Sequence, residues 1–171
     1  GEIPRERRIE LNKRYNEKAR QIVGIDLLRE DFPVEDELLP QYKRIGEVFD
    51  GEYLFDGNSE WLKGNCESPE ELEKLLDRVD SMNLRDFIFP SNWESEKKRI
   101  YETYGRRPQL FGSVRGPVTL ATSVFGVENL IFLIYDYPEL AKRFSDTIAN
   151  VILGYIEIFI EEAGYTQDNF P

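Results

Sequence analysis

The longest regular pattern of hydrophobic and polar positions covers residues 138–164. Its apolar residues recur at helical spacing along one stripe: Leu140, Phe144, Ile148, Val151, Ile152, Tyr155, Ile156, Phe159 and Ile160. This spacing predicts a long amphipathic helix. The helix is expected to begin at a capping motif, Asp136–Glu139, and to end near Gly164. A stripe of this kind is typical of a helix that covers a sheet.

Two shorter helices are predicted from their capping signals. In "ESPEELEKLLDRV", Ser68 is the expected N-cap, Pro69 suits the first helical position and Glu71 completes a capping box. In "SNWESEKKRIYETYG", Ser91 is the expected N-cap and Gly105 the stop. Both helices therefore have bounds that local sequence predicts.

The remaining elements are shorter. Residues 4–24 contain good helix formers and predict an N-terminal helix, and residues 40–49 predict a short helix. Residues 51–57 predict a short strand that closes on a turn, and residues 107–114 predict a buried strand. Strands that alternate with capped amphipathic helices predict a parallel sheet in an α/β fold.

Composition excludes two kinds of catalytic centre. The chain has 171 residues, of which 40% are hydrophobic and 32% charged, as in globular proteins. Histidine is absent and Cys66 is the single cysteine. A zinc site of the usual Cys/His kind and a Ser-His-Asp triad therefore cannot be complete within these residues. We interpret Cys66 as a small buried residue without a functional role.

Charge and hydropathy bear on partners and location. The net charge is −11, and nucleic-acid binding needs a basic surface instead. No apolar run approaches the roughly 18 residues that span a bilayer. No signal peptide precedes the charged N-terminus. We therefore expect a cytoplasmic protein that binds neither nucleic acid nor membrane.

The segment Gly112–Gly126 carries the candidate chemistry. Glycines at 112 and 116 let the backbone approach a bound group, and Pro117 favours a helix start whose free N–H groups suit an anion. Arg115 adds a positive charge with the fork geometry for carboxylate or phosphate. The alternative is an ordinary strand-to-helix turn with Arg115 in solvent, and both interpretations remain open from the residues alone.

Four further residues are candidates for the same site. Thr119 and Ser123 would bring hydroxyl groups toward it. Asp56 falls where a strand-end carboxylate would touch a ligand, although Asp before Gly is also ordinary turn chemistry. Trp61 would wall a planar tetrapyrrole, or pack under a loop.

Ordered motifs give a resemblance to a known family. The run "RRPQLFGSVRGPVTLATSVFGVENLIFLIYDYPELAKRFSD" resembles the central segment of the uroporphyrinogen decarboxylase superfamily. The shared elements are G-P-x-T-L, then G-x-E-N-L, then D-x-P-E-L, in that order. "EWLKGNCESPEELEKLLDRV" and "FPSNWESEKKRIYETYG" resemble its upstream parts. The likeness covers residues 60–164 of one domain and leaves residues 1–58 as a divergent N-terminal segment.

The resemblance implies a (β/α)₈ TIM barrel, with the active site at the carboxyl ends of the strands. Such a barrel takes about 250 residues, so this chain is expected to supply its N-terminal half. Half a barrel leaves sheet edges open and is expected to form a homodimer or to aggregate. The essential catalytic groups are then expected in the other half.

Departures from the family pattern favour one branch. The decarboxylases carry an R-Q-A-G-R signature that binds substrate carboxylates, whereas residues 4–15 read "PRERRIELNKRY". They also place a tyrosine where this chain has Ser123. The resemblance therefore implies methyl transfer involving a corrinoid (cobalamin) on a carrier protein, with a small-molecule methyl donor or acceptor. Zinc ligands, where the enzyme uses zinc, would lie outside this chain.

Two alternatives to methyl transfer remain. One is decarboxylation of uroporphyrinogen or of a related tetrapyrrole carboxylate by an enzyme without the usual signature. The other is a non-catalytic fragment or binding module.

Overall fold

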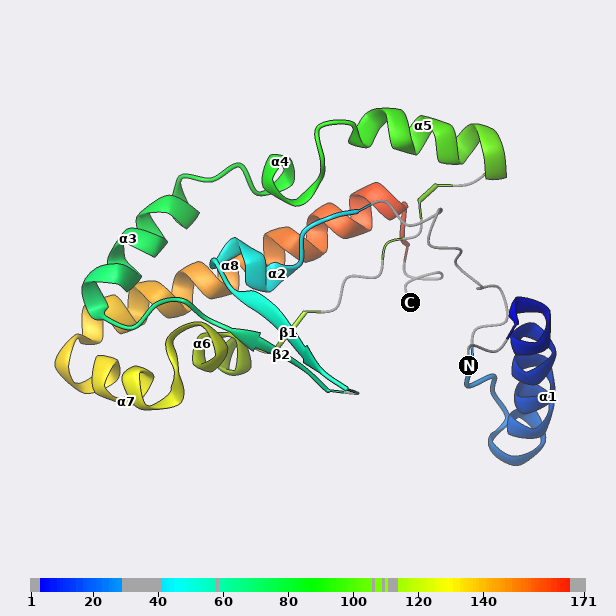
Figure 1. The fold of residues 1–171 in the computed structure, drawn as a ribbon, viewed down its shortest axis with the longest axis horizontal. Helices are drawn as coiled ribbons and strands as arrows, with labels where there is room; N and C mark the ends of the chain where they lie inside the picture. The colour runs from blue at the N-terminus through cyan, green and yellow to red at the C-terminus, as the bar shows by residue number, and fades with distance from the viewer. Residues whose placement is uncertain are drawn as a thin grey trace. The chain divides into compact units, whose positions relative to one another are not determined.

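The chain forms two compact units, residues 1–39 and residues 40–171. A computed structural model describes residues 4–28, 41–57, 59–105, 107–108, 110 and 114–166. The described part of the first unit is helix α1 (Arg5–Val23) and the segment that follows it (Figure 1). The described elements of the second unit are α2 (Ile45–Val48), β1 (Glu52–Asp56), β2 (Ser59–Lys63), α3 (Pro69–Asp80), α4 (Leu84–Ile88), α5 (Trp93–Tyr104), α6 (Pro117–Phe125), α7 (Val127–Asp136) and α8 (Pro138–Ala163).

A buried asparagine organises the first unit. Helix α1 ends at Gly24, as predicted. The Asn16 side chain is fully buried, and its Oδ1 accepts hydrogen bonds from the N–H groups of Leu27 (3.1 Å) and Leu28 (2.8 Å). Its Nδ2 donates to the Leu28 carbonyl. These bonds hold the segment after Gly24 against the helix, because a buried amide needs hydrogen-bond partners.

Capping signals predicted α3 well. The Ser68 hydroxyl accepts a hydrogen bond from the Glu71 N–H (3.2 Å), and Pro69 occupies the first helical position. The Glu71 carboxylate accepts a bond from the Glu67 N–H (2.8 Å), so it reaches back one residue beyond the N-cap.

The starts of α5 and α8 differ from the prediction. Asn92, rather than Ser91, is the N-cap of α5, and Gly105 ends the helix as predicted. Asp136 is the last residue of α7, so it does not cap α8, and Tyr137 takes the N-cap position without a capping bond.

The two strands correct the predicted sheet. β1 was expected as a strand, but it pairs antiparallel with β2. The reason is the short connection at residues 57–58, since parallel strands need a crossover of a dozen residues or more. The described residues are mostly helical and contain this two-stranded sheet, with no parallel sheet and no barrel. Of the strand expected at 107–114, the residues that the structure describes are not in a strand.

Helix α8 is the centre of the second unit (Figure 1). Its apolar stripe is buried as predicted, and Phe144, Ile148 and Tyr155 are each 1% exposed. The helix contacts α2, α3, α4, α6 and α7, so the stripe packs against helices and not against the predicted sheet. A stripe reports that a face is buried, whatever element buries it.

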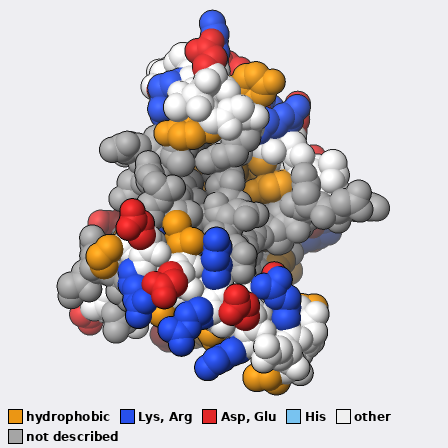
Figure 2. Space-filling view, turned by 90° about the vertical axis from the view of Figure 1, so that its right-hand side faces the viewer, with side chains coloured by type: hydrophobic (Ala, Val, Ile, Leu, Met, Phe, Trp, Pro, Cys, Tyr) orange, Lys and Arg blue, Asp and Glu red, His pale blue; other side chains and the backbone are white. Residues whose placement is uncertain are grey.

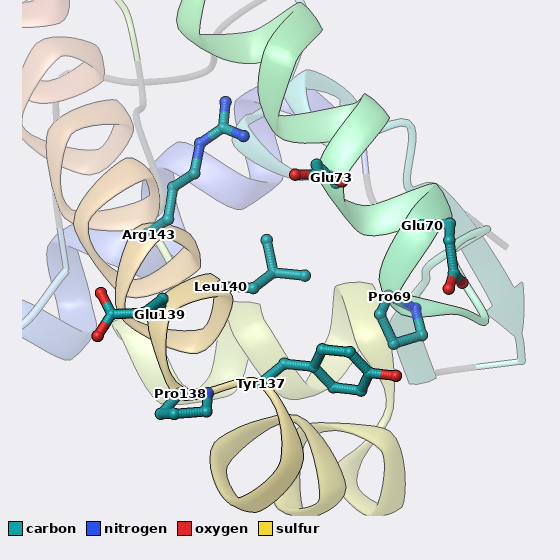
Figure 3. A pocket seen from close by; sticks show the side chains of 8 residues that line it. All are labelled: Pro69, Glu70, Glu73, Tyr137, Pro138, Glu139, Leu140 and Arg143. Atoms are coloured by element: carbon teal, nitrogen blue, oxygen red, sulfur yellow. The ribbon is translucent and has the colours of Figure 1, made fainter.

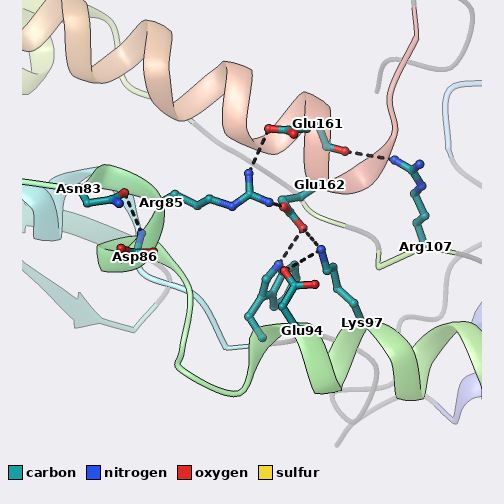
Figure 4. A network of polar contacts seen from close by, with 9 residues as sticks. Asn83, Arg85, Asp86, Glu94, Lys97, Arg107, Glu161 and Glu162 are labelled. Atoms are coloured by element: carbon teal, nitrogen blue, oxygen red, sulfur yellow. Dashed lines mark hydrogen bonds and ion pairs between the residues drawn. The ribbon is translucent and has the colours of Figure 1, made fainter.

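A buried carboxylate joins α4 and α5 to the end of α8 (Figure 4). The Glu162 side chain is 2% exposed. It accepts a hydrogen bond from the Trp93 indole N–H (2.7 Å) and forms ion pairs with Lys97 (3.0 Å) and Arg85. These partners compensate for the cost of burying a charge.

Strand β2 ends at a close backbone contact with α6. The Gly64 N–H donates to the Ser123 carbonyl (2.9 Å), one of the last carbonyls of α6, which lack partners inside the helix. A Cβ atom at position 64 would lie 1.9 Å from the Val124 carbonyl oxygen. Because that neighbour is backbone, no rotamer change makes room, and only glycine fits.

Helix α7 exposes much of its apolar surface. Val127, Ile131, Phe132, Ile134 and Tyr135 are each more than half exposed. No single helix in the described part of the chain has the length and apolar character to cross a membrane. Helices α6 and α7 meet those criteria only as a pair, with a bend of 98° between them.

We predict that Gly64→Ala destabilises the protein by about 1–3 kcal/mol or more, the usual cost of forcing extra volume into a packed contact. Urea denaturation followed by circular dichroism measures the change. Gly116→Ala is the control for added volume, since no described atom lies within 4 Å of a Cβ at that position, and it should lose only the smaller N-cap preference for Gly over Ala. Equal stability of the two variants would contradict the contact.

Glu162→Gln is predicted to lower the free energy of unfolding by about 1–3 kcal/mol, because Arg85 and Lys97 lose their shared carboxylate. The neighbouring Glu161 has a side chain that is 71% exposed. Glu161→Gln is therefore expected to stay within about 0.5 kcal/mol of the wild type. A reversed order of the two variants would show that Glu162 is not the buried link.

Candidate functional site

The N-terminus of α6 has the groups of an anion site. Gly116 is the N-cap and Pro117 the first helical residue, and neither a capping side chain nor an acidic residue occupies this turn. The first N–H groups of a helix have no partner inside it, and those of Val118 and Thr119 are of this kind. They carry the positive end of the helix dipole, which attracts negative charge.

Gly116 is not required by the fold. Its φ of −59° is open to any residue. No described atom lies within 4 Å of the position of a Cβ. The turn therefore has open space where a bound group would approach the backbone. The other predicted glycine of this segment, Gly112, lies outside the described residues.

Arg115 is half-buried and makes no ion pair or hydrogen bond with the residues that the structure describes. Its charge nevertheless reaches Glu60 on β2. The pKa of the Glu60 carboxyl is lowered, first by its hydrogen bond from Arg44 and to a smaller extent by the charge of Arg115. Arg115 thus keeps its hydrogen-bonding capacity available at the start of α6.

Arg44 is fully engaged by its neighbours. Its guanidinium binds both carboxylate oxygens of Glu60, with Nη2 at 3.0 Å from Oε2. The same guanidinium lies 3.5 Å from the ring centroid of Tyr53. The Tyr53 hydroxyl in turn accepts a bond from the Gly46 N–H (3.0 Å). This arrangement holds the Glu60 side chain in place on β2.

The predicted hydroxyl groups lie on α6. Thr119 and Ser123 are four residues apart and so share one face of the helix. Thr119 is exposed and Ser123 is half-buried. The Thr122 hydroxyl donates to the Thr119 carbonyl (3.1 Å), so it satisfies the helix itself. Thr119 is the hydroxyl nearer to the first turn of α6.

Asp56 and Trp61 lie on the other face of the hairpin. Leu54 pairs with Trp61 and Asp56 with Ser59. Because side chains alternate along a strand, these residues share one face, and Glu60 and Leu62 share the opposite one. The structure therefore does not bring Asp56 or Trp61 to the face that Arg115 influences. Asp56 precedes Gly57, whose φ of 59° lies in the left-handed region. This is the geometry expected where Asp and Gly form a turn.

Cys66 is buried, and its thiol is poorly suited to bind a metal ion. Burial raises the pKa of its thiol to about 11, and the charge of Glu71 acts in the same direction. No group of three or more His, Cys, Asp or Glu side chains in the described residues is placed to hold a metal ion. These residues therefore do not fit a zinc ion.

A cleft of about 460 Å³ lies between the first turns of α3 and α8 (Figure 3). Its lining residues are Pro69, Glu70, Glu73, Tyr137, Pro138, Glu139, Leu140 and Arg143. Arg143 is paired with Asp77 (2.8 Å) and Asp80 (2.7 Å). With that charge neutralised, three glutamates make the cleft unfavourable for an anion. The sequence patterns gave no signal for this cleft.

A second cleft, of about 380 Å³, lies beside the Glu162 network and is lined by Phe89 and Trp93 among others. Both clefts have the size that suits drug-sized molecules, and neither includes Arg115. A corrinoid is larger than either of these two clefts.

Figure 2 shows Lys and Arg side chains mixed with Asp and Glu side chains on the face that it draws. This mixture does not test the expected absence of nucleic-acid binding, which stays a prediction.

The fold and the site define a mostly helical protein with an uncapped helix start beside an available guanidinium. A model of the Uroporphyrinogen decarboxylase (URO-D) family matches residues 95–166. No curated protein and no solved structure matches the chain. The matched residues include Arg115 and all of α6 to α8, and the matched family is one of enzymes. The match does not distinguish the branches of the superfamily.

We predict that Cys66 resists alkylation at neutral pH. The rate of reaction with iodoacetamide should rise until about pH 11, since only the thiolate reacts. The unfolded protein in urea is the control, with an ordinary thiol pKa of about 8.5. Because the folded pKa is the higher one, Cys66 should also lower stability as the pH rises from about 8.5 toward 11. Identical pH profiles for folded and unfolded protein would contradict the burial.

Proposed function

We propose that this chain is part of an enzyme of the uroporphyrinogen decarboxylase superfamily, and that Arg115–Thr119 binds an anionic group of its small-molecule substrate. The observation that carries the proposal is the juxtaposition of Arg115 with the uncapped start of α6, inside the matched segment. The barrel implied by the resemblance belongs to this proposal, and its parallel strands would lie outside the described residues, whose two strands form an antiparallel hairpin.

The residues of this turn would hold the anion by complementary hydrogen bonds. The planar guanidinium of Arg115 can donate two parallel bonds to a carboxylate. The N–H groups of Val118 and Thr119 would donate to the same anion, and Gly116 would let it approach the backbone. The Thr119 hydroxyl adds a further donor. These contacts orient a substrate and do not themselves break a bond.

Methyl transfer that involves a corrinoid carrier is the reaction we favour. A tetrapyrrole with many carboxylates needs several available arginines in one place. The N-terminal segment, where the decarboxylases carry their arginine signature, is helix α1 here. Its Arg7 pairs with Glu10 (2.6 Å), and Arg20 pairs with Asp26 (3.0 Å). Two of the arginines of α1 are therefore engaged locally, whereas Arg8 and Arg14 have no ion pair with the described residues.

The corrinoid would carry the methyl group and would be presented by a partner protein. We propose that the described residues bind and orient the substrate, through Arg115 and the first N–H groups of α6. A cytoplasmic location and self-association as a homodimer remain part of the proposal. Decarboxylation is the second candidate, because the matched family is the one that contains the decarboxylase.

Two assays separate the branches, and both use the full-length enzyme of which this chain is proposed to be a part. With cob(I)alamin and a methyl donor, the proposal expects the cobalt absorption spectrum to change as methylcobalamin forms. With uroporphyrinogen, it expects no coproporphyrinogen. Formation of coproporphyrinogen together with an unchanged cobalt spectrum would overturn methyl transfer in favour of decarboxylation.

Gly116→Ser tests the anion site separately from the reaction. Serine is a better N-cap than glycine, so the free energy of unfolding should rise by roughly a few tenths of a kcal/mol. Its hydroxyl would take the same N–H groups that an anion needs, so propionate should bind at least about fivefold more weakly. Amide NMR shifts of Val118 and Thr119 during a propionate titration give the dissociation constant.

Arg115→Gln should weaken propionate binding about tenfold, the order expected for losing a hydrogen bond from a charged group. Arg8→Gln in α1 changes the net charge equally and is the control. Unchanged affinity in both Gly116→Ser and Arg115→Gln would contradict an anion site at the start of α6.

A further inference from the structure

Helix α7 buries only one side of its surface. Leu133 is 1% exposed, and Leu130 is partly buried against the same core. The other apolar residues of the helix are 51–80% exposed, and we call them the α7 face: Val127, Ile131, Phe132, Ile134 and Tyr135. A surface helix normally turns polar residues toward solvent. A helix that is apolar on its outer side as well is therefore expected to be covered.

The α7 face is one continuous surface centred on Ile131. Val127 lies one helical turn before Ile131 and Tyr135 one turn after it, so the three side chains are neighbours in a line along the helix. Ile134 lies beside this line on the side nearer the core. Phe132 extends the face on its other side.

The charges around this face do not suit a lipid surface. Residues 117–136, which form α6 and α7, contain no Lys or Arg. Helices that lie on membranes combine an apolar face with basic residues, which bind anionic headgroups. The charged residues of α7 are Glu128 and Asp136, near its two ends. A centre free of charge is typical of the core of a protein–protein interface.

The exposed area is close to what a stable dimer needs. An aromatic side chain covers about 150–250 Å² and an aliphatic one somewhat less, so at these exposed fractions the α7 face presents on the order of 550 Å². Two copies placed face to face would bury roughly 1,100 Å² from these side chains, against the roughly 1,200 Å² at which specific interfaces begin. Atoms at the rim of the contact add to this area.

The α7 face complements itself when two copies run antiparallel. A twofold axis at Ile131 sets this residue against its own copy and sets Val127 against the partner's Tyr135. The Tyr135 hydroxyl would then lie near the partner's Glu128 and would donate a hydrogen bond to that carboxylate. A parallel pair would instead set Glu128 against its own copy. The antiparallel pair also opposes the two helix dipoles, which is the favourable arrangement.

We propose that the α7 face joins two copies of this enzyme in a twofold antiparallel contact centred on Ile131. This inference rests on the self-association that is part of the proposed function, and it adds the surface that associates. It is independent of the reaction and of the anion site at the start of α6.

The test measures the mass of the full-length enzyme by sedimentation velocity. Ile131→Glu and Ile131→Lys each set two like charges against each other at the axis, so the dissociation constant of the dimer should rise at least about hundredfold. An equal mixture of the two variants sets opposite charges there and should regain most of the dimer. Tyr101→Glu is the control, since Tyr101 is 64% exposed on α5, outside the α7 face, and should leave the dimer unchanged.

The possible results separate the occupants of the face. A dimer that persists in both variants, or variants that do not associate when mixed, would overturn the contact at Ile131 and leave self-association to another surface. A monomeric wild type would overturn self-association as well. Thermal unfolding followed by circular dichroism would then assign the face to the interior of the enzyme if both variants melt at lower temperature. Binding of the monomer to phosphatidylcholine vesicles would assign it to lipid.

Discussion

The second unit depends on a place where two backbones touch without a side chain between them. Gly64 lies against the last turn of α6, and its N–H satisfies a carbonyl of that turn. A larger residue would push β2 away from the helix. The hairpin would then lose its position along α6. The packing of the hairpin on the rest of the unit therefore depends on a contact that only glycine allows.

Local signals in the sequence predicted most of the helices because caps and apolar stripes act within a few residues. Ser68, Gly105 and Gly164 mark helix ends as expected. The pairing of the strands was not predictable in the same way, and the expected parallel sheet was wrong. β1 was identified as a strand, but its partner is set by a short turn that forces an antiparallel hairpin. The stripe of α8 indicated burial correctly, and the covering elements turned out to be helices.

In the candidate site, too, local features could be predicted from the sequence and long-range contacts could not. Gly116 and Pro117 were predicted from turn chemistry, and they do form the start of α6. The partners of Glu60 and Glu162 were not predictable, because Arg44 and Trp93 meet them only in the folded chain. Strand alternation decides the rest: Trp61 and Glu60 are adjacent in sequence and lie on opposite faces.

The central claim is that the start of α6 receives an anion between Arg115 and the first N–H groups of the helix. A crystal of the protein soaked with 3-bromopropionate tests it most directly, since bromine is located by its anomalous scattering. The account predicts a bromine peak near the start of α6, with the carboxylate in hydrogen-bond distance of Arg115. A peak in the cleft between α3 and α8, with none at α6, would contradict it.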